Sequence, residues 1–253
     1  YRANKIEGEV LTYYESGELK QKANFENDLP QGETKLYYQN GQVKERLGFR
    51  AGLMEGRRFQ YDPEGNLLGV AQYKEGELHG EQLTYHGEGA IKSKVFFADG
   101  LQEGAAQFFY PNGKLAREGS FKKGTPTGSF KSYYENGQLE ESGAYRKGLV
   151  SGEITSYFET GAKREIAYYD SNGRLSKIQT FFPDGSLEKT GSYRNGLEEG
   201  DFVIFFPNGK ERERTPYRNG KMQGIQKIYA EDGKLLVERV FEDGKLLETR
   251  TKD

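Results

Sequence analysis

Hydrophobic and polar residues alternate along this chain in short runs that repeat every 24 residues. Each repeat holds two runs rich in aromatic and small residues, and turn-forming residues separate the runs. Because no stretch keeps a period of 3.6 residues, the pattern predicts β-strands and no helices. One aromatic column runs through Tyr13, Tyr37, Tyr61, Tyr85, Phe109, Tyr133, Tyr157, Phe181, Phe205 and Tyr229. A second runs through Phe25, Phe49, Tyr73, Phe97, Phe121, Tyr145, Tyr169, Tyr193, Tyr217 and Phe241.

Glycines keep the same period and mark the repeat boundaries. Units begin near residues 8, 32, 56, 80, 104, 128, 152, 176, 200 and 224, and every one of these positions except Ser176 is Gly. A second glycine series is unbroken, whereas Asp28 and Asn172 fill gaps in a third. Asp and Asn tolerate positive φ better than most residues, so these positions also fit turns. The period predicts one repeat domain over residues 1–253, built from about ten β-hairpins.

The turn residues predict how paired strands align. Pro precedes the glycine-containing turn at four equivalent positions, which are Pro63, Pro111, Pro183 and Pro207. This order favours a type I turn followed by a Gly in the left-handed bulge position, which makes a three-residue loop with a bulge. We expect the second turn of each repeat to have the same form, so that Tyr133 faces Leu139 and Tyr145 faces Leu149. Odd-numbered strand residues would then share one face of the sheet.

Charge divides between odd and even positions. Odd positions carry 14 basic and 23 acidic residues, and even positions carry 23 basic and 16 acidic residues. The odd positions also hold most of the aromatic residues. The sequence therefore predicts an acidic, aromatic face and a basic reverse face.

Composition excludes several classes of function. The chain has 37 Lys and Arg against 39 Asp and Glu, a balance that argues against a dedicated nucleic-acid binder. It has no Cys, which excludes disulfides, thiolate metal sites and a Cys nucleophile. No apolar run approaches the length of a membrane span. We expect no cofactor and no metal.

Three segments carry a family resemblance. They are GSFKSYYENGQLEESGAYRKGLVSG (128–152), GETKLYYQNGQVKERLGFRAGLMEG (32–56) and GDFVIFFPNGKERERTPYRNGKMQG (200–224), in which Glu211 replaces the usual aliphatic residue. This unit resembles the bacterial MORN repeat variant of YwqK-like antitoxin proteins. The unit from Gly152 to Gly200 departs from it, because Gly173 sits one position late. The resemblance implies an all-β, elongated, solenoid-like, single-layer antiparallel sheet that binds proteins.

Catalytic residues are not evident. The chain has two histidines, of which His79 lies in a linker and His86 lies beside Tyr85 in an aromatic column. Both fit structural roles better than a triad or a metal site, so we expect no enzyme activity. The run Lys210–Arg214 (KERER) indicates a strand with salt bridges, since acids alternate with the cations.

The candidate partner-binding face consists of Tyr61, Tyr85, Tyr133, Tyr157, Glu141 and Glu165. Exposed rings give contact area and acidic residues attract cations, so we expect a cationic, toxin-like protein partner and no nucleic acid. The favoured function is a binding scaffold, in the role of an antitoxin or immunity protein that sterically blocks a basic toxin.

Two alternatives stay open: a cell-envelope or surface scaffold, and a membrane-surface protein that binds anionic lipid through the even-numbered face. Membrane contact is the less favoured of these hypotheses. We expect the bacterial cytoplasm or, if a signal peptide was removed before Tyr1, the cell envelope. The sequence does not predict the oligomeric state.

Overall fold

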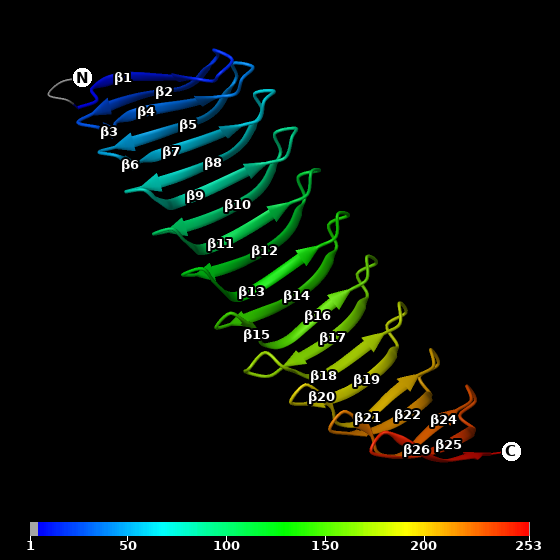
Figure 1. Cartoon of the computed structure of the whole chain (residues 1–253). Helices are drawn as coiled ribbons and strands as arrows, with labels where there is room; N and C mark the ends of the chain where they lie inside the picture. Colours follow the sequence, from blue (N-terminus) through cyan, green and yellow to red (C-terminus); the bar gives the residue numbers. More distant parts are fainter. Residues whose placement is uncertain (1–4, 253) are drawn as a thin grey trace. The chain divides into compact units, whose positions relative to one another are not determined.

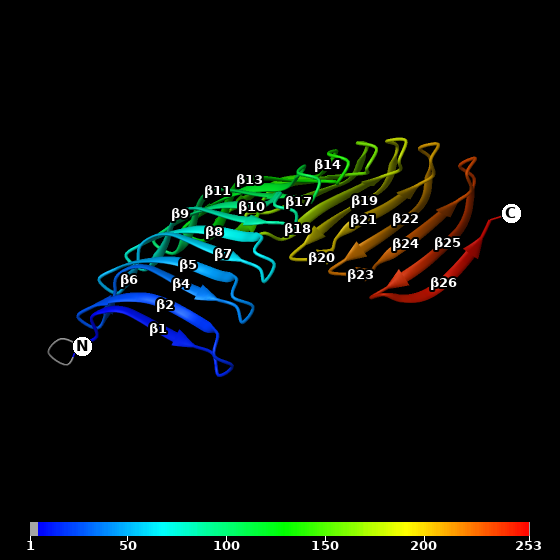
Figure 2. The ribbon, with the colours of Figure 1, turned by 90° about the horizontal axis from the view of Figure 1, so that it is seen from above.

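The computed structural model describes residues 5–252, which form β-strands and contain no helix. None of these residues therefore lies in a helix that could cross a membrane. The chain divides into two compact units, Tyr1–Thr125 and Pro126–Asp253. Within each unit, consecutive strands pair in antiparallel fashion and lie side by side in sequence order (Figures 1 and 2). The all-β fold of antiparallel hairpin repeats is confirmed.

Unit 1 contains β1 (Gly8–Tyr13), β2 (Leu19–Glu26), β3 (Leu29–Pro30), β4 (Gly32–Tyr37), β5 (Val43–Arg50), β6 (Leu53–Met54), β7 (Gly56–Tyr61), β8 (Leu67–Lys74), β9 (Glu77–Tyr85), β10 (Ile91–Ala98), β11 (Leu101–Phe109) and β12 (Leu115–Lys122). Unit 2 contains β13, which starts at the boundary (Thr125–Tyr133), β14 (Leu139–Arg146), β15 (Leu149–Val150), β16 (Gly152–Tyr157), β17 (Lys163–Tyr169), β18 (Leu175–Phe181), β19 (Leu187–Arg194), β20 (Leu197–Glu198), β21 (Gly200–Phe205), β22 (Glu211–Arg218), β23 (Lys221–Met222), β24 (Gly224–Tyr229), β25 (Leu235–Glu242) and β26 (Lys245–Thr251).

The first turn of each repeat has the predicted three-residue form. In the hairpin of β13 and β14, Tyr133 pairs with Leu139, as expected. The N–H of Tyr134 donates to the carbonyl of Gln138 at 2.9 Å, and Gly137 takes the left-handed conformation with φ of 94°. Only glycine adopts this conformation without a steric penalty, which explains the unbroken glycine series.

A second β-bulge, beyond the one predicted at the left-handed glycine, follows each of these turns and was not predicted. Next to the Tyr133–Leu139 pair, Ser132 pairs with Glu141, so Glu140 is an extra residue in the second strand. The same shift separates Tyr37 from its neighbour in the β4–β5 hairpin, and it recurs in the other hairpins. One inserted residue reverses the odd-even relation between the two strands.

The prediction for the second turn is wrong. Tyr145 pairs with Val150 and Arg146 with Leu149, so the loop has two residues and not three. Both loop residues have positive φ, 53° for Lys147 and 80° for Gly148. This is the type I′ conformation, which matches the twist of the flanking strands.

The expected irregularity in the unit from Gly152 is real, and its cause is a change of loop type. Between β17 and β18 the chain makes a second three-residue loop, in which the N–H of Asp170 donates to the carbonyl of Arg174 at 2.9 Å. Gly173 supplies the left-handed residue with φ of 73°. Asp28 has the positive φ expected from the sequence, 67°, whereas the glycine gap at Asn172 is explained by the displaced Gly173.

Each sheet has two faces, which we call face A and face B. Residues that pair across strands share a face. Beyond the bulges, face A holds the even residues of the first strand and the odd residues of the second strand of each repeat, and face B holds the others. A residue between a bulge and its loop lies on the face of its pairing partner, as Leu139 lies on face B with Tyr133. In unit 2, face A includes the row Phe130, Gly143, Ile154, Ala167, Ile178, Gly191, Phe202, Thr215, Gln226 and Arg239.

Face A carries most of the core. The buried hydrophobic residues on it are Ala23, Ala71, Val95 and Ala106 in unit 1, and Phe130, Ile154, Ala167 and Phe202 in unit 2. Within residues 5–252 no large side chain is fully buried. A single-layer sheet therefore relies on packing between neighbouring strands, because no second layer covers it.

Glycines opposite aromatic rings make this packing possible in unit 2. Gly143 lies opposite Phe130, and a Cβ atom at Gly143 would come within 3.0 Å of the Phe130 ring. A Cβ atom at Gly191 would lie 2.2 Å from Cε1 of Phe202. Each ring therefore covers the backbone of a neighbouring strand where a side chain would exclude it.

Side chains at the three-residue loops link successive repeats. The hydroxyl groups of Tyr14, Tyr38 and Tyr134 donate to carbonyl oxygens 23 residues later, at 2.6, 2.8 and 2.7 Å. At the opposite edge, backbone N–H groups of the two-residue loops donate to a side chain from the preceding repeat, as Ala51 does to Gln31 at 2.8 Å. These bonds fix neighbouring repeats relative to one another within each unit.

Tyr134→Phe is expected to destabilise unit 2 by about 1 kcal/mol, because the carbonyl of Tyr157 loses its hydroxyl donor. His86→Tyr is expected to change stability little, since the His86 ring Nε2 already occupies this position, 2.9 Å from the carbonyl of Phe109. Urea unfolding followed by circular dichroism measures both. A larger loss of stability in His86→Tyr than in Tyr134→Phe would contradict this account of the hydrogen bonds between repeats.

Candidate functional site

The four tyrosines of the candidate partner-binding face lie on face B. Tyr61, Tyr85, Tyr133 and Tyr157 end β7, β9, β13 and β16, the first strands of their repeats. Each is partly buried. Their backbones have structural roles, as the hydrogen bonds to the carbonyls of Tyr61 and Tyr157 show.

The two glutamates of the same candidate face lie on face A. Glu141 in β14 pairs with Ser132 and Ser156, and Glu165 in β17 pairs with Ser156 and Thr180. The expectation that odd-numbered residues share one face is wrong, because the bulge after every three-residue loop reverses the parity. The structure therefore does not bring these glutamates together with Tyr133 and Tyr157. The basic even-numbered face predicted alongside it does not exist as one surface either.

The aromatic residues that do accompany these glutamates belong to the second aromatic column. Tyr169, Tyr193 and Tyr217 lie on face A of unit 2, at the ends of β17, β19 and β22. Tyr193 pairs directly with Glu198 across β19 and β20. We call the set Tyr169, Tyr193, Tyr217, Glu141, Glu165, Glu198 and Glu213 the tyrosine–glutamate row.

The electrostatic coupling within this row appears in the tyrosine hydroxyls. Burial raises the pKa of Tyr169, and the charges of Glu165 and Glu141 raise it further. Burial, Glu198 and Glu165 raise the pKa of Tyr193 in the same way.

Tyr217 follows the same pattern at the other end of the row. Burial raises its pKa first, followed by the charges of Glu198 and Glu213. Each glutamate therefore acts on one or two tyrosines. The negative potential extends along the row over several strands and is not confined to one pair.

Phe202 holds two of these tyrosines in place. Its ring lies 5.3 Å from the ring of Tyr193 and 5.1 Å from that of Tyr217, both in edge-on geometry. The Nζ atom of Lys189 lies 5.6 Å from the centre of the Phe202 ring. Face A thus already holds a cation against an aromatic ring, which is the contact expected from a cationic ligand.

The candidate face predicted from the sequence took its tyrosines from the first aromatic column and none from the second. The missing information was the extra residue in each second strand, which places the second column, and not the first, on the side of Glu141 and Glu165. No residue type marks this extra position, which Glu140 occupies in β14.

His86 has the structural role expected of it, whereas the position expected for His79 is wrong. His86 bonds the carbonyl of Phe109, as described above. His79 lies within β9, not in a linker, and lines a shallow recess with Lys74, Glu75, Glu77 and Asp99. Across residues 5–252, no group of three or more His, Asp and Glu residues is placed to hold a metal ion.

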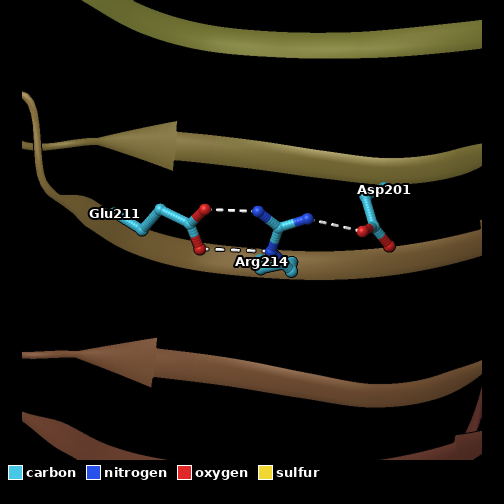
Figure 3. A network of polar contacts seen from close by, with 3 residues as sticks. All are labelled: Asp201, Glu211 and Arg214. Atoms are coloured by element: carbon cyan, nitrogen blue, oxygen red, sulfur yellow. Dashed lines mark hydrogen bonds and ion pairs between the residues drawn. The ribbon is translucent and has the colours of Figure 1, made fainter.

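The run Lys210–Arg214 forms the ion pairs that its sequence indicated. Arg214 donates from Nε and Nη2 to the carboxylate of Glu211, and from Nη1 to Asp201 at 2.6 Å (Figure 3). Bonds from both carboxylates raise the pKa of Arg214. Two acids therefore occupy the donor groups of this guanidinium, and the prediction of a salt-bridged strand is confirmed.

Comparison with solved structures finds distant similarity. A TcdB2–TccC3 crystal structure is 13% identical with a TM-score of 0.24, and the match covers 94% of this chain and 16% of that one. A porin-like protein from Bacteroides uniformis is 11% identical with a TM-score of 0.23, and the match covers 96% and 94% of the two chains. This chain thus spans about a sixth of the length of the matched TcdB2–TccC3 chain. No curated protein matches the sequence.

The family comparison matches more than half of the chain. The MORN repeat variant pattern is found at residues 6–27, 30–50, 54–75, 78–99, 102–123, 126–147 and 222–243. The unmatched stretch contains the loop at Gly173 that departs from the repeat. MORN repeats are non-catalytic repeat scaffolds used in protein or membrane binding. With its 24-residue hairpins and its matching repeats, the chain belongs to the MORN repeat variant family.

Proposed function

We propose that this protein is a non-enzymatic binding scaffold that holds a cationic protein partner against face A of unit 2. The observation that supports this most directly is the tyrosine–glutamate row. Three tyrosines recur at 24-residue intervals there, and burial, followed by the glutamate charges, raises the pKa of each hydroxyl. A surface with negative potential beside aromatic rings attracts Arg and Lys side chains and stacks them.

The periodicity of the row favours a protein over a small molecule. Tyrosines on alternate strands of an antiparallel sheet lie about 10 Å apart, so the row extends over roughly 20 Å. A small ligand would contact one repeat, whereas a protein segment with spaced basic side chains would contact several. Tyr side chains add contact area at low entropic cost, which suits such an interface.

The finer part of the proposal is an antitoxin or immunity role. A toxin that acts on nucleic acid carries basic residues at its active surface, and a sheet laid across that surface would block it sterically. The support for this role is the charge of the row and the resemblance of the repeat unit to antitoxin proteins. The proposed binding face and its physical basis do not depend on the antitoxin role.

Charge reversal is the first test of the proposed face. Glu165→Lys is expected to weaken the binding of an arginine-rich peptide by about tenfold, because Glu165 acts on both Tyr169 and Tyr193. Raising the salt concentration is expected to weaken binding to the unmodified protein as well. Isothermal titration calorimetry with a nine-residue arginine peptide measures both effects.

Glu153→Lys is the matched control. Glu153 is an exposed residue of the same unit on face B, where its charge acts on Tyr168. The change in net charge is the same, so a general electrostatic effect would weaken binding equally in both variants. Equal weakening, or a peptide affinity that does not respond to Glu165→Lys, would contradict the proposed face.

A further inference from the structure

Unit 1 carries a second surface of opposite charge on face B. Lys22, Lys35 and Arg46 lie on β2, β4 and β5 and are direct cross-strand neighbours. Like charges directly opposite one another destabilise a sheet. Three adjacent cations are therefore costly for folding and suggest a role outside the fold.

Two carboxylates only partly neutralise these cations. Lys22 is paired with Glu9 at 2.6 Å. Glu33 is shared, with Lys35 Nζ at 3.2 Å and Arg46 Nε at 2.9 Å. Burial acts to raise the pKa of Glu33, but the bonds from Arg46 and Lys35 outweigh it and lower that pKa. Three positive charges thus face two negative ones.

A recess lies beside these cations. It has a volume of about 340 Å³ and is lined by Lys35, Gln42, Val43, Arg46, Tyr61 and Gly65. The Tyr61 hydroxyl is close enough to Arg46 to contribute to the raised pKa of that guanidinium, after the larger contribution of Glu33. Lysine, guanidinium, hydroxyl and amide groups therefore surround one space, and all of them can donate hydrogen bonds to an anion.

The protein contains an internal comparison for this site. Arg214 stands seven repeats after Arg46, at the same position of the hairpin. There Glu211 occupies the position of Val43, and its carboxylate bonds two nitrogens of the guanidinium (Figure 3). Val203 occupies the position of Lys35. One acid is common to both positions, because Asp201 corresponds to Glu33. The second acid of unit 2 is replaced in unit 1 by a valine, and unit 1 has a second cation.

We infer that the Arg46 recess binds a phosphate monoester group. Arg46 and Lys35 would hold the phosphate oxygens, since guanidinium geometry matches phosphate and lysine adds a point charge. Tyr61 and Gln42 would donate further hydrogen bonds. Bound phosphate would relieve the repulsion among Lys22, Lys35 and Arg46, so binding would also stabilise unit 1.

The test is calorimetric titration with phenyl phosphate at constant ionic strength, with phenol as the uncharged control. Saturable binding of phenyl phosphate and none of phenol is expected. Arg46→Gln is expected to weaken binding by about tenfold or more, because it removes a charge-assisted donor.

Val43→Glu is the more specific variant. It introduces beside Arg46 a carboxylate equivalent to Glu211, which bonds Arg214, and it leaves every proposed phosphate ligand in place. It is expected to weaken binding as much as Arg46→Gln. Arg214→Gln is the control and is expected to leave binding unchanged. Absence of saturable binding, or equal effects of Arg214→Gln and Arg46→Gln, would overturn the inference.

A second experiment distinguishes which kind of molecule carries the phosphate. Vesicles of phosphatidylcholine with phosphatidic acid present the same group on a lipid. Recruitment that is lost in both Arg46→Gln and Val43→Glu assigns a lipid-borne phosphate. Phenyl phosphate binding without such recruitment assigns a phosphate carried by a soluble molecule or a protein.

Discussion

Phe202→Ala is expected to destabilise unit 2 by about 3–4 kcal/mol. Phe202 is 8% exposed, and its ring contacts those of Tyr193 and Tyr217. In a single-layer sheet no other element can fill the space left by the ring, so the loss includes both the buried area and the aromatic contacts. The ring also covers the backbone at Gly191, which alanine at position 202 would expose.

Urea unfolding followed by circular dichroism measures this change. Leu197→Ala in the same unit is the control, because Leu197 is 47% exposed at a two-residue loop and is expected to cost less than about 1 kcal/mol. Similar losses in the two variants would show that face A does not supply the core of unit 2.

Arg58→Met is expected to destabilise unit 1 by about 2–3 kcal/mol. Arg58 donates to Glu45 from Nη2 at 2.7 Å and from Nε at 3.2 Å, and the Glu45 side chain is 14% exposed. Methionine keeps much of the side-chain volume but leaves that carboxylate without its bidentate partner in a largely buried position. The bond to Glu45, partly opposed by burial, raises the pKa of Arg58, so this guanidinium stays charged at neutral pH.

The neighbouring cation supplies the control for this prediction. Arg57 is exposed on the opposite face of β7, so Arg57→Met removes the same charge without breaking a buried pair. It is expected to change the free energy of unfolding by less than about 0.5 kcal/mol. A loss in Arg57→Met as large as that in Arg58→Met would indicate an effect of net charge and not of the Glu45 pair.

The repeat period was predictable because it depends on backbone conformation. Gly137 and its equivalents take positive φ, which only glycine adopts cheaply, so the loop positions are visible in the sequence. The three-residue loop followed from Pro63 and its equivalents, and the observed Tyr133–Leu139 pair agrees with it. Local turn chemistry therefore determines the hairpins.

The faces were not predictable from the same signals. The bulge at Glu140 depends on hydrogen bonding between two strands, and no residue type at that position requires it. The two-residue loop at Lys147 and Gly148 needs positive φ at a lysine, which sequence preference disfavours but strand twist favours. The bulge and the length of the second loop each change which face the odd-numbered residues of the next strand occupy. Together they decide which aromatic column lies beside Glu165.

The recess at Arg46 shows a second limit. Lys35 and Arg46 are 11 positions apart in the sequence and become direct neighbours only through the register of β4 and β5. Arg214 differs from Arg46 because Glu211 bonds it, whereas Val43 stands at the equivalent position beside Arg46. This difference is present in the sequence, but the strand pairing is needed to interpret it.

Fluorine NMR of protein labelled with 3-fluorotyrosine tests the central claim most directly, because the two aromatic columns lie on opposite faces of each sheet. Titration with the nine-residue arginine peptide is expected to shift the resonances of Tyr169, Tyr193 and Tyr217, assigned by single Tyr→Phe variants. The resonances of Tyr133 and Tyr157 on face B are expected to stay in place. Shifts confined to Tyr133 and Tyr157, or no shifts at a saturating peptide concentration, would contradict a cation-binding face built on the tyrosine–glutamate row.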